Sequence, residues 1–375
     1  MKKNPLLKLE NLGQSIWMDF IRRGMISSGE LKQLIEEDGL RGVTSNPSIF
    51  EKAITGSHDY DDAIRTLALE GKSVDQIYSA LTVEDIQRVA DLFRPVYDRL
   101  DGADGLVSLE VSPRLAHDTA GTVADARRLW VAVARPNVMI KVPGTIEGLP
   151  AIQQLIGAGI NVNITLLFGL PRYRQVAEAY IAGLETLAAQ GKPLKSVASV
   201  ASFFLSRIDT LLDSTLEKIM VADKSKADFA EIFRGQVAIF SAKAAYRIYK
   251  EIFDSERFSK LKDQGARTQR VLWASTSTKN PAYNDLKYVE ALIGPETIDT
   301  IPLETLAAYR DHGKPASRLN KDGVKAAGTL RRLSEAGIDL DRVTQQLEDE
   351  GVQKFVEAFD VLMNTLEEKR VAAIR

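Results

Sequence analysis

The side chains best suited to chemistry interrupt or end a series of apolar, β-branched segments, and Lys141 stands out among them. The apolar stretch 138–140 (VMI) precedes it, and 142–143 (VP) follows. Burying an unpaired ammonium group costs several kcal/mol, so a lysine in such a segment is paired, neutralised or both. Because desolvation lowers a lysine pKa, the neutral amine could attack a carbonyl and form a Schiff base. The alternative is a structural ion pair with a neighbouring carboxylate.

Two carboxylates occupy comparable positions. Asp19 closes the apolar stretch 16–18 (IWM), where it would be a proton shuttle beside the lysine or else a helix N-cap or loop-end carboxylate. Glu110 stands between Leu109 and Val111, inside an apolar run. We expect Glu110 to be either a base that activates water or the salt-bridge partner of the lysine.

Amides and hydroxyls end other segments. Asn46 precedes Pro47, a pair that on its own is typical of the start of a turn. Asn163 and Thr165 share one face of a strand, because side chains alternate with a period of two, and Ser202 lies in the sixth segment. Such groups can bind sugar hydroxyls or satisfy hydrogen bonds within a core.

Two places favour an anion. Arg207 opens a predicted helix, whose N-terminal dipole and unpaired N–H groups attract phosphate, although it could instead pair with Asp209 or Asp213. The loop from Ser275 to Lys279 (STSTK) follows the seventh segment, where barrels often bind phosphate, although it could be an ordinary polar turn. Together an amine, two carboxylates and a cationic rim indicate carbon–carbon bond chemistry on a phosphorylated sugar.

The elements that must position these residues alternate between strand and helix. Eight segments have the near-continuous hydrophobicity of parallel strands that are buried on both faces: 15–20, 42–47, 105–113, 137–144, 159–168, 197–204, 271–277 and 297–303. Helical periodicity lies between and after them, over 28–38, 82–100, 122–134, 173–189 and 227–253. The pattern predicts an α/β fold, a (β/α)8 TIM barrel, with an open sheet as the alternative.

No linker or repeat divides the chain, so we expect residues 1–375 to form a single barrel domain. Helical additions are expected around 215–260 and at the C-terminal stretch 317–375, where no strand pattern occurs. In the barrel the residues named above lie toward the C-terminal strand ends, and all would face one mouth.

Composition excludes several classes of protein. With 49 Lys+Arg, 51 Asp+Glu and a net charge of −2, nothing favours binding to nucleic acid or to an anionic membrane surface. The absence of cysteine excludes disulfides, thiol catalysis and cysteine-based metal sites. The three histidines have no ligand-like spacing. Because no signal peptide and no apolar run of about 18 residues is present, we expect a soluble, cytoplasmic protein.

Five segments in order resemble the transaldolases, in particular their longer bacterial subgroup: GVTSNPSIF (42–50), SLEVSP (108–113), MIKVPGT (139–145), INVNITLLF (160–168) and SFFLSRID (202–209). The resemblance implies a Schiff-base transferase of the non-oxidative pentose phosphate pathway that needs no metal or organic cofactor. It would move a dihydroxyacetone unit from sedoheptulose 7-phosphate or fructose 6-phosphate to glyceraldehyde 3-phosphate or erythrose 4-phosphate. The family's lysine lies on the fourth strand, as Lys141 does in our count.

The resemblance also implies roles for the matching residues. Lys141 would attack the ketose carbonyl, and Asp19 would take the proton of the sugar hydroxyl as the carbon–carbon bond breaks. Glu110 and Thr165 would hold the water that relays protons. The remaining positions would bind substrate, with dihydroxyacetone contacts from Asn46, Asn163 and Ser202 and phosphate contacts from Arg207, Ser275 and Lys279. Shorter family members have arginine where Lys279 stands, and a lysine lacks the bidentate fork.

Three other functions remain open at this point. An aldolase would release the three-carbon unit to solvent, but its relatives carry tyrosine where this chain has Phe204, which has no proton to give. A catalytically inactive binding barrel and a phosphosugar isomerase are the others. The sequence does not settle the oligomeric state, and a homodimer is one alternative.

Overall fold

The computed structural model describes residues 4–320 and 323–374. Its strands are parallel and pair in chain order around a closed barrel, in which β1 also pairs with β8. The strands are β1 (Gln14–Met18), β2 (Gly42–Val43), β3 (Leu106–Glu110), β4 (Val138–Pro143), β5 (Val162–Leu167), β6 (Ser199–Phe204), β7 (Arg270–Ala274) and β8 (Thr297–Ile301). Each falls on one of the eight predicted segments. The α/β class and the (β/α)8 TIM barrel are therefore confirmed, and the open-sheet alternative is wrong.

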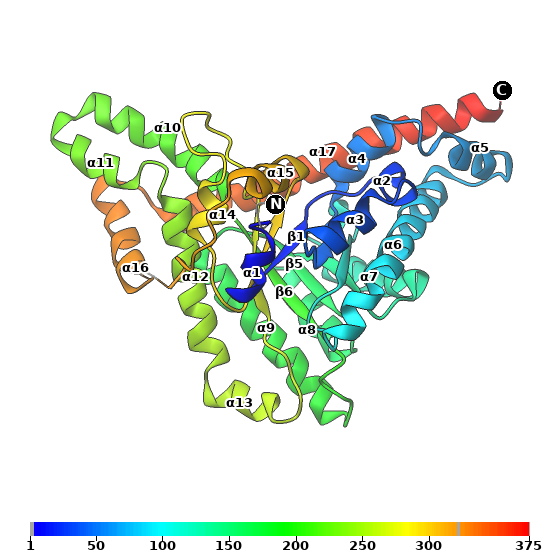
Figure 1. Cartoon of the computed structure of the whole chain (residues 1–375), viewed down its shortest axis with the longest axis horizontal. Coiled ribbons are helices and arrows are strands. Elements are labelled where there is room, and N and C mark those ends of the chain that lie inside the picture. Colours follow the sequence, from blue (N-terminus) through cyan, green and yellow to red (C-terminus); the bar gives the residue numbers. More distant parts are fainter. Residues whose placement is uncertain (1–3, 321–322, 375) are drawn as a thin grey trace.

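Helices flank the strands of the barrel (Figure 1). They are α1 (Leu7–Asn11), α2 (Arg23–Ser27), α3 (Glu30–Glu37), α4 (Pro47–Thr55), α5 (Asp61–Leu69), α6 (Val74–Arg99), α7 (Thr119–Val133), α8 (Gly148–Gly157), α9 (Leu170–Ala189), α10 (Ser206–Ala222), α11 (Ala227–Phe233), α12 (Val237–Phe253), α13 (Glu256–Lys262), α14 (Lys287–Ala291), α15 (Leu303–His312), α16 (Gly323–Arg331) and α17 (Leu340–Ile374). Short 3-10 turns are η1 (Pro113–Leu115), η2 (Lys224–Lys226) and η3 (Arg332–Ala336). Among the described helices, none has the length and apolar character needed to cross a membrane.

Two helical predictions need correction. Helix α6 begins at Val74 rather than at residue 82, because Ser73 and Gln76 form a capping box that the periodicity did not register. The stretch 227–253 is two helices, α11 and α12, and not one. The chain breaks at Gly235, which has a φ of +63° that glycine adopts at little cost, and its N–H donates to Asp213 Oδ1 at 2.6 Å.

The C-terminal stretch is helical as predicted in its described part, through α16, η3 and α17, while residues 321–322 and 375 lie outside the described residues. Helix α17 is 35 residues long. It runs across one end of the barrel from the region of α10 to α4 and α5 (Figure 1), and it packs against α4, α5 and α6. This end holds the carboxyl ends of the strands, so α17 covers part of the barrel mouth.

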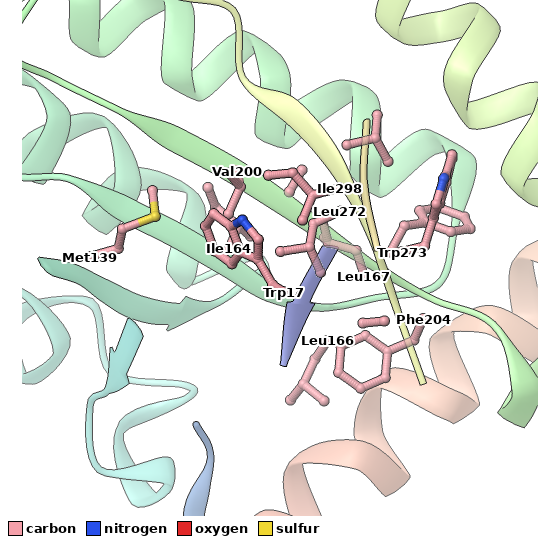
Figure 2. Close-up of a cluster of buried hydrophobic side chains, with 14 of the residues drawn as sticks. Trp17, Met139, Ile164, Leu166, Leu167, Val200, Phe204, Leu272, Trp273 and Ile298 are labelled. Atoms are coloured by element: carbon pink, nitrogen blue, oxygen red, sulfur yellow. The ribbon is translucent and has the colours of Figure 1, made fainter. Parts of the chain in front are cut away.

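Large apolar side chains fill the barrel below the mouth. Figure 2 shows Trp17, Met139, Val200, Leu272 and Ile298 in one cluster, and each is buried. Four of them lie two residues before a polar side chain of the mouth, namely Asp19, Lys141, Ser202 and Thr300, whereas Leu272 lies two residues before Ala274. Because side chains alternate with a period of two, the apolar layer and the polar layer share one inner face. The lower barrel is thus a solid support for the polar groups above it.

A buried carboxyl group lies on β8 outside that polar layer. Asp299 alternates with Ile298 and Thr300, and therefore faces the surrounding helices. It is 0% exposed, and neither of its carboxylate oxygens accepts a hydrogen bond from the described residues. Burial raises the pKa of Asp299 to about 8, although the nearby hydroxyl of Thr276 opposes the shift.

We expect Asp299→Asn to be increasingly more stable than the native chain as the pH rises from about 4 to about 8. Above pH 4 the unfolded chain releases this proton while the folded chain retains it, so unfolding of the native protein becomes easier with rising pH. The difference in unfolding free energy should grow by up to about 5 kcal/mol over that range and then level off. Urea unfolding at several pH values measures it, with the exposed Asp62→Asn as control. A difference that stays constant with pH would contradict the assignment.

Candidate active site

Polar residues at the strand ends line a cavity of about 400 Å³ at the barrel mouth. Seven of the ten predicted site residues line it: Asp19, Asn46, Lys141, Ser202, Arg207, Ser275 and Lys279. The other three are Glu110 on β3 and Asn163 and Thr165 on β5. They are buried on the two strands that flank β4 and do not line this cavity. The topology thus brings residues from across more than 250 positions of sequence to one place.

Lys141 lies on β4 with its amine inside the barrel. Its side chain is 4% exposed, and Nζ lies 3.1 Å from Glu110 Oε2 and donates to the carbonyl oxygen of Ser45 at 3.1 Å. Glu110 is directly opposite on β3, because the register pairs the two residues. The salt-bridge alternative for Glu110 is therefore confirmed as a contact. It does not exclude a catalytic role, since a buried lysine needs such a partner in the resting state.

Glu110 is also poised to hold a proton. Burial raises its pKa, and the charge of Lys141 opposes the shift. The contact with Lys141 is an ion pair without hydrogen-bond alignment, and neither carboxylate oxygen accepts a hydrogen bond from the described residues. Glu110 also lines a second cavity, of about 990 Å³, between α6 and α7. The carboxylate oxygens themselves are buried, and the side chain is 3% exposed.

Asp19 follows β1 at the rim of the mouth. Its Oδ1 accepts a hydrogen bond from Thr44 Oγ1 at 2.7 Å, which fixes the orientation of the carboxyl group. Burial raises the pKa of Asp19, whereas the charges of Lys141 and Lys279 and the Thr44 hydrogen bond lower it. These opposed influences suit a carboxyl group that must both take up and return a proton.

A hydrogen-bonded chain crosses the barrel floor. Asn163 donates through Nδ2 to Ser108 Oγ at 3.0 Å and accepts through Oδ1 from Ser202 Oγ at 2.7 Å. These polar groups therefore include both predicted kinds. Asn163 makes hydrogen bonds within the core, whereas Ser202 lines the cavity, where it can contact a sugar. Thr165 differs, because its buried Oγ1 has no hydrogen-bond partner in the described part of the chain.

Asn46 has a structural role at the start of a helix, where the sequence indicated the start of a turn. It is the N-cap of α4, and its side-chain oxygen accepts the N–H of Ile49 at 3.0 Å. Pro47 occupies the first helical position, where its missing N–H costs nothing. Because the cap uses the oxygen, the amide nitrogen of Asn46 keeps its donors for the cavity.

Arg207 projects into the mouth from the first turn of α10. The alternative pairing with Asp209 or Asp213 is wrong, since Asp209 accepts from Lys287 at 3.2 Å and Asp213 from Tyr283 at 2.7 Å. Among the described residues nothing accepts a hydrogen bond from the buried Nη1 of Arg207. A half-buried guanidinium whose buried nitrogen has no partner, at a helix N-terminus, is a strong site for an anion.

The loop after β7 adds hydroxyls and a second cation. Ser275 has a φ of +55°, a strained conformation for a residue other than glycine, and its hydroxyl lies 2.8 Å from that of Ser206 at the start of α10. Lys279 is exposed at the rim and donates to Ser277 Oγ at 2.6 Å. The strained turn therefore holds the loop beside Arg207.

Sequence reasoning missed several lining residues. Thr44 lies within a predicted segment, and its hydroxyl beside the strand end was a usable signal. Lys52 and Glu304 are exposed residues of α4 and α15 without any distinguishing pattern. Phe355 comes from α17, and its ring centroid lies 5.8 Å from Lys141 Nζ. No local signal pointed to it, since its place depends on how α17 packs.

No cluster of three or more potential metal ligands occurs within residues 4–320 and 323–374. The sequence matches the model of the family described as transaldolase/fructose-6-phosphate aldolase over residues 16–366. The transaldolase of Trichodesmium erythraeum is 48% identical to the chain over 373 residues, which cover 98% of both proteins. Transaldolase 2 of Nostoc punctiforme is 47% identical over 98% of both, and the transaldolase of Saccharopolyspora erythraea is 46% identical over 96% of both.

Proposed function

The chain belongs to the transaldolase/fructose-6-phosphate aldolase family, and from that membership we propose how its barrel performs a transaldolase reaction on phosphorylated sugars. It is an enzyme of the transferase class. The observation that carries the proposed mechanism is the buried amine of Lys141, 3.1 Å from the Glu110 carboxylate and beneath a cavity that the unpaired Arg207 also lines. The preferred donor ketose is sedoheptulose 7-phosphate or fructose 6-phosphate.

In the first half-reaction Lys141 Nζ, once neutral, bonds to the ketose carbonyl carbon, and water leaves as the Schiff base forms. Glu110 and Thr165 hold that water, since both have buried oxygens without partners in the described residues. Asp19 then takes the proton of the sugar hydroxyl as the neighbouring carbon–carbon bond breaks. The bonding electrons move onto the Schiff base and make an enamine, and the aldose phosphate departs.

In the second half-reaction the enamine carbon attacks the aldehyde carbon of an acceptor, glyceraldehyde 3-phosphate or erythrose 4-phosphate. The new hydroxyl takes its proton from Asp19, and water hydrolyses the Schiff base and frees Lys141. Asn46, Asn163 and Ser202 bind the three-carbon unit. Arg207, Ser275 and Lys279 bind the phosphate of donor and acceptor in turn.

The first test is borohydride trapping in the presence of fructose 6-phosphate, followed by intact mass and peptide mapping. Reduction of the enamine's Schiff base should leave one three-carbon unit on the peptide that contains Lys141. No adduct, or an adduct on another lysine, would overturn the mechanism. Free dihydroxyacetone made as fast without an acceptor as with one would favour an aldolase instead.

We expect Arg207→Ala to raise the KM for fructose 6-phosphate by on the order of 100-fold, because a buried charged hydrogen bond to phosphate is lost. The effect on unphosphorylated fructose should be small, since that donor makes no such contact. Steady-state kinetics with both donors measure the difference. Lys279→Ala is the matched comparison, and its exposed amine should contribute less. Equal losses for both donors would contradict a phosphate role for Arg207.

We further propose that the whole chain works as one domain in the cytoplasm. The support for one domain is that α17 contributes Phe355 to the mouth, so the C-terminal addition is part of the site. The support for the cytoplasm is that ionic sugar phosphates stay in the compartment where they are made.

A further inference from the structure

Helix α17 lies unusually close to the barrel at Gly351. A Cβ on Gly351 would stand 2.9 Å from Leu166 Cδ2 and 3.7 Å from Arg207 Nη1. Leu166 is itself held at a φ of +60°, where the pairing of β5 with β6 shifts register. Figure 2 shows Leu166 beside Phe204 at one end of the buried cluster. The absent side chain of Gly351 therefore lets α17 rest on the mouth.

Phe355 stands one helical turn beyond Gly351, on the same face of α17. Phe355 is 3% exposed and lines the mouth cavity, with its ring centroid 5.8 Å from Lys141 Nζ. Phe204, at the end of β6, lines the same cavity. The amine that would carry the substrate thus opens into a space with two phenyl rings in its walls.

We propose that Phe355 is a specificity-determining residue that keeps solvent from the enamine and so directs the three-carbon unit to an acceptor sugar. The inference rests on the proposed function. The 5.8 Å between Nζ and the ring centroid leaves room for a carbon bonded to Nζ to contact the ring inside the shared cavity. A phenyl ring has no proton to donate, and it fills the space that water would otherwise occupy.

The enamine has two fates, and the ring favours one of them. In transfer, the enamine carbon bonds to the aldehyde carbon, and the aldehyde oxygen takes up a proton. In release, the enamine carbon takes a proton from water, and a second water then hydrolyses the Schiff base to give dihydroxyacetone and free Lys141. Only release needs water at the enamine carbon, so opening the wall on the side of α17 should raise release relative to transfer.

The test measures dihydroxyacetone formed from fructose 6-phosphate without acceptor, against transfer with glyceraldehyde 3-phosphate present. We expect Phe355→Ala to raise the ratio of release to transfer on the order of tenfold, and Phe355→Leu to raise it about threefold because leucine keeps part of the apolar wall. The matched control is Phe359→Leu. Phe359 lies one turn further along α17, and its ring packs edge-on against that of Tyr78 with the two centroids 5.2 Å apart. It lines the cavity between α6 and α7 and not the mouth cavity. The ratio of release to transfer in Phe359→Leu should match that of the native chain.

Borohydride trapping separates the two levels of failure. If the native chain forms no adduct on Lys141, the proposed function is wrong. If the native chain and Phe355→Leu both form the three-carbon adduct and the ratio stays within about twofold of native, the role of Phe355 is wrong. A ratio that rises equally in Phe359→Leu would also overturn it, because the cause would then be a general loosening of α17. If the alanine variant does not fold, the leucine variant decides.

Discussion

We expect Lys141→Met to lower kcat by on the order of 10⁵-fold, because a nucleophile held in place is worth that much or more over an unpositioned one. Methionine keeps most of the length and apolar volume of the lysine stem but has no amine. The Glu110 carboxylate, which loses its partner at 3.1 Å, can become neutral by taking up a proton, since burial raises its pKa and the opposing charge of Lys141 is gone. The barrel should therefore remain folded while the reaction is lost.

The measurement is the transfer rate together with borohydride trapping and thermal unfolding of the same sample. Lys32→Met provides the control, because Lys32 is 65% exposed on α3 and forms only a long ion pair of 3.8 Å with Glu36. It should keep native turnover and trap the adduct normally. Retention by Lys141→Met of more than about one part in a hundred of the native rate would show that Lys141 is not the nucleophile.

The fold was predictable where local pattern and burial agree. Parallel strands that are covered on both faces have to be apolar throughout, so their eight segments were visible in the sequence and their number pointed to a barrel. The break at Gly235 was not, because it depends on the carboxylate of Asp213, more than twenty residues earlier, which accepts the glycine N–H. The path of α17 across the mouth was also not predictable, because its face is chosen by contacts with α4, α5 and α6.

The candidate site was predictable for a topological reason. The carboxyl ends of the parallel strands of a closed barrel all lie at one mouth. The polar residues at those ends can therefore be predicted to line one cavity before any contact between them is known. It was harder to predict whether a single polar residue faces the mouth or pairs with a neighbour. Arg207 and Asp209 are two positions apart on a helix and point to different sides, so one faces the mouth while the other binds Lys287. Phe355 had no such rule, since nothing in its own segment marks it.

We expect Asp19→Asn to lower kcat by about 10²- to 10⁴-fold while leaving Schiff-base formation largely intact. The amide keeps the shape of the carboxyl group and can still accept the Thr44 hydroxyl that bonds Oδ1 at 2.7 Å. It cannot take the proton of the sugar hydroxyl, so the carbon–carbon bond should remain unbroken. Bound ketose would then accumulate on Lys141 as a complete Schiff base.

Trapping turns this expectation into a difference in mass. With fructose 6-phosphate and borohydride, the native chain should retain a three-carbon unit, whereas Asp19→Asn should retain the entire six-carbon sugar phosphate on the same lysine. The exposed Asp62→Asn should behave as the native chain does. A three-carbon adduct that forms on Asp19→Asn at the native rate would mean that another group takes the proton. The six-carbon adduct would separate two steps that share one cavity, because attack by Lys141 needs only its own amine, while cleavage needs a base at the rim.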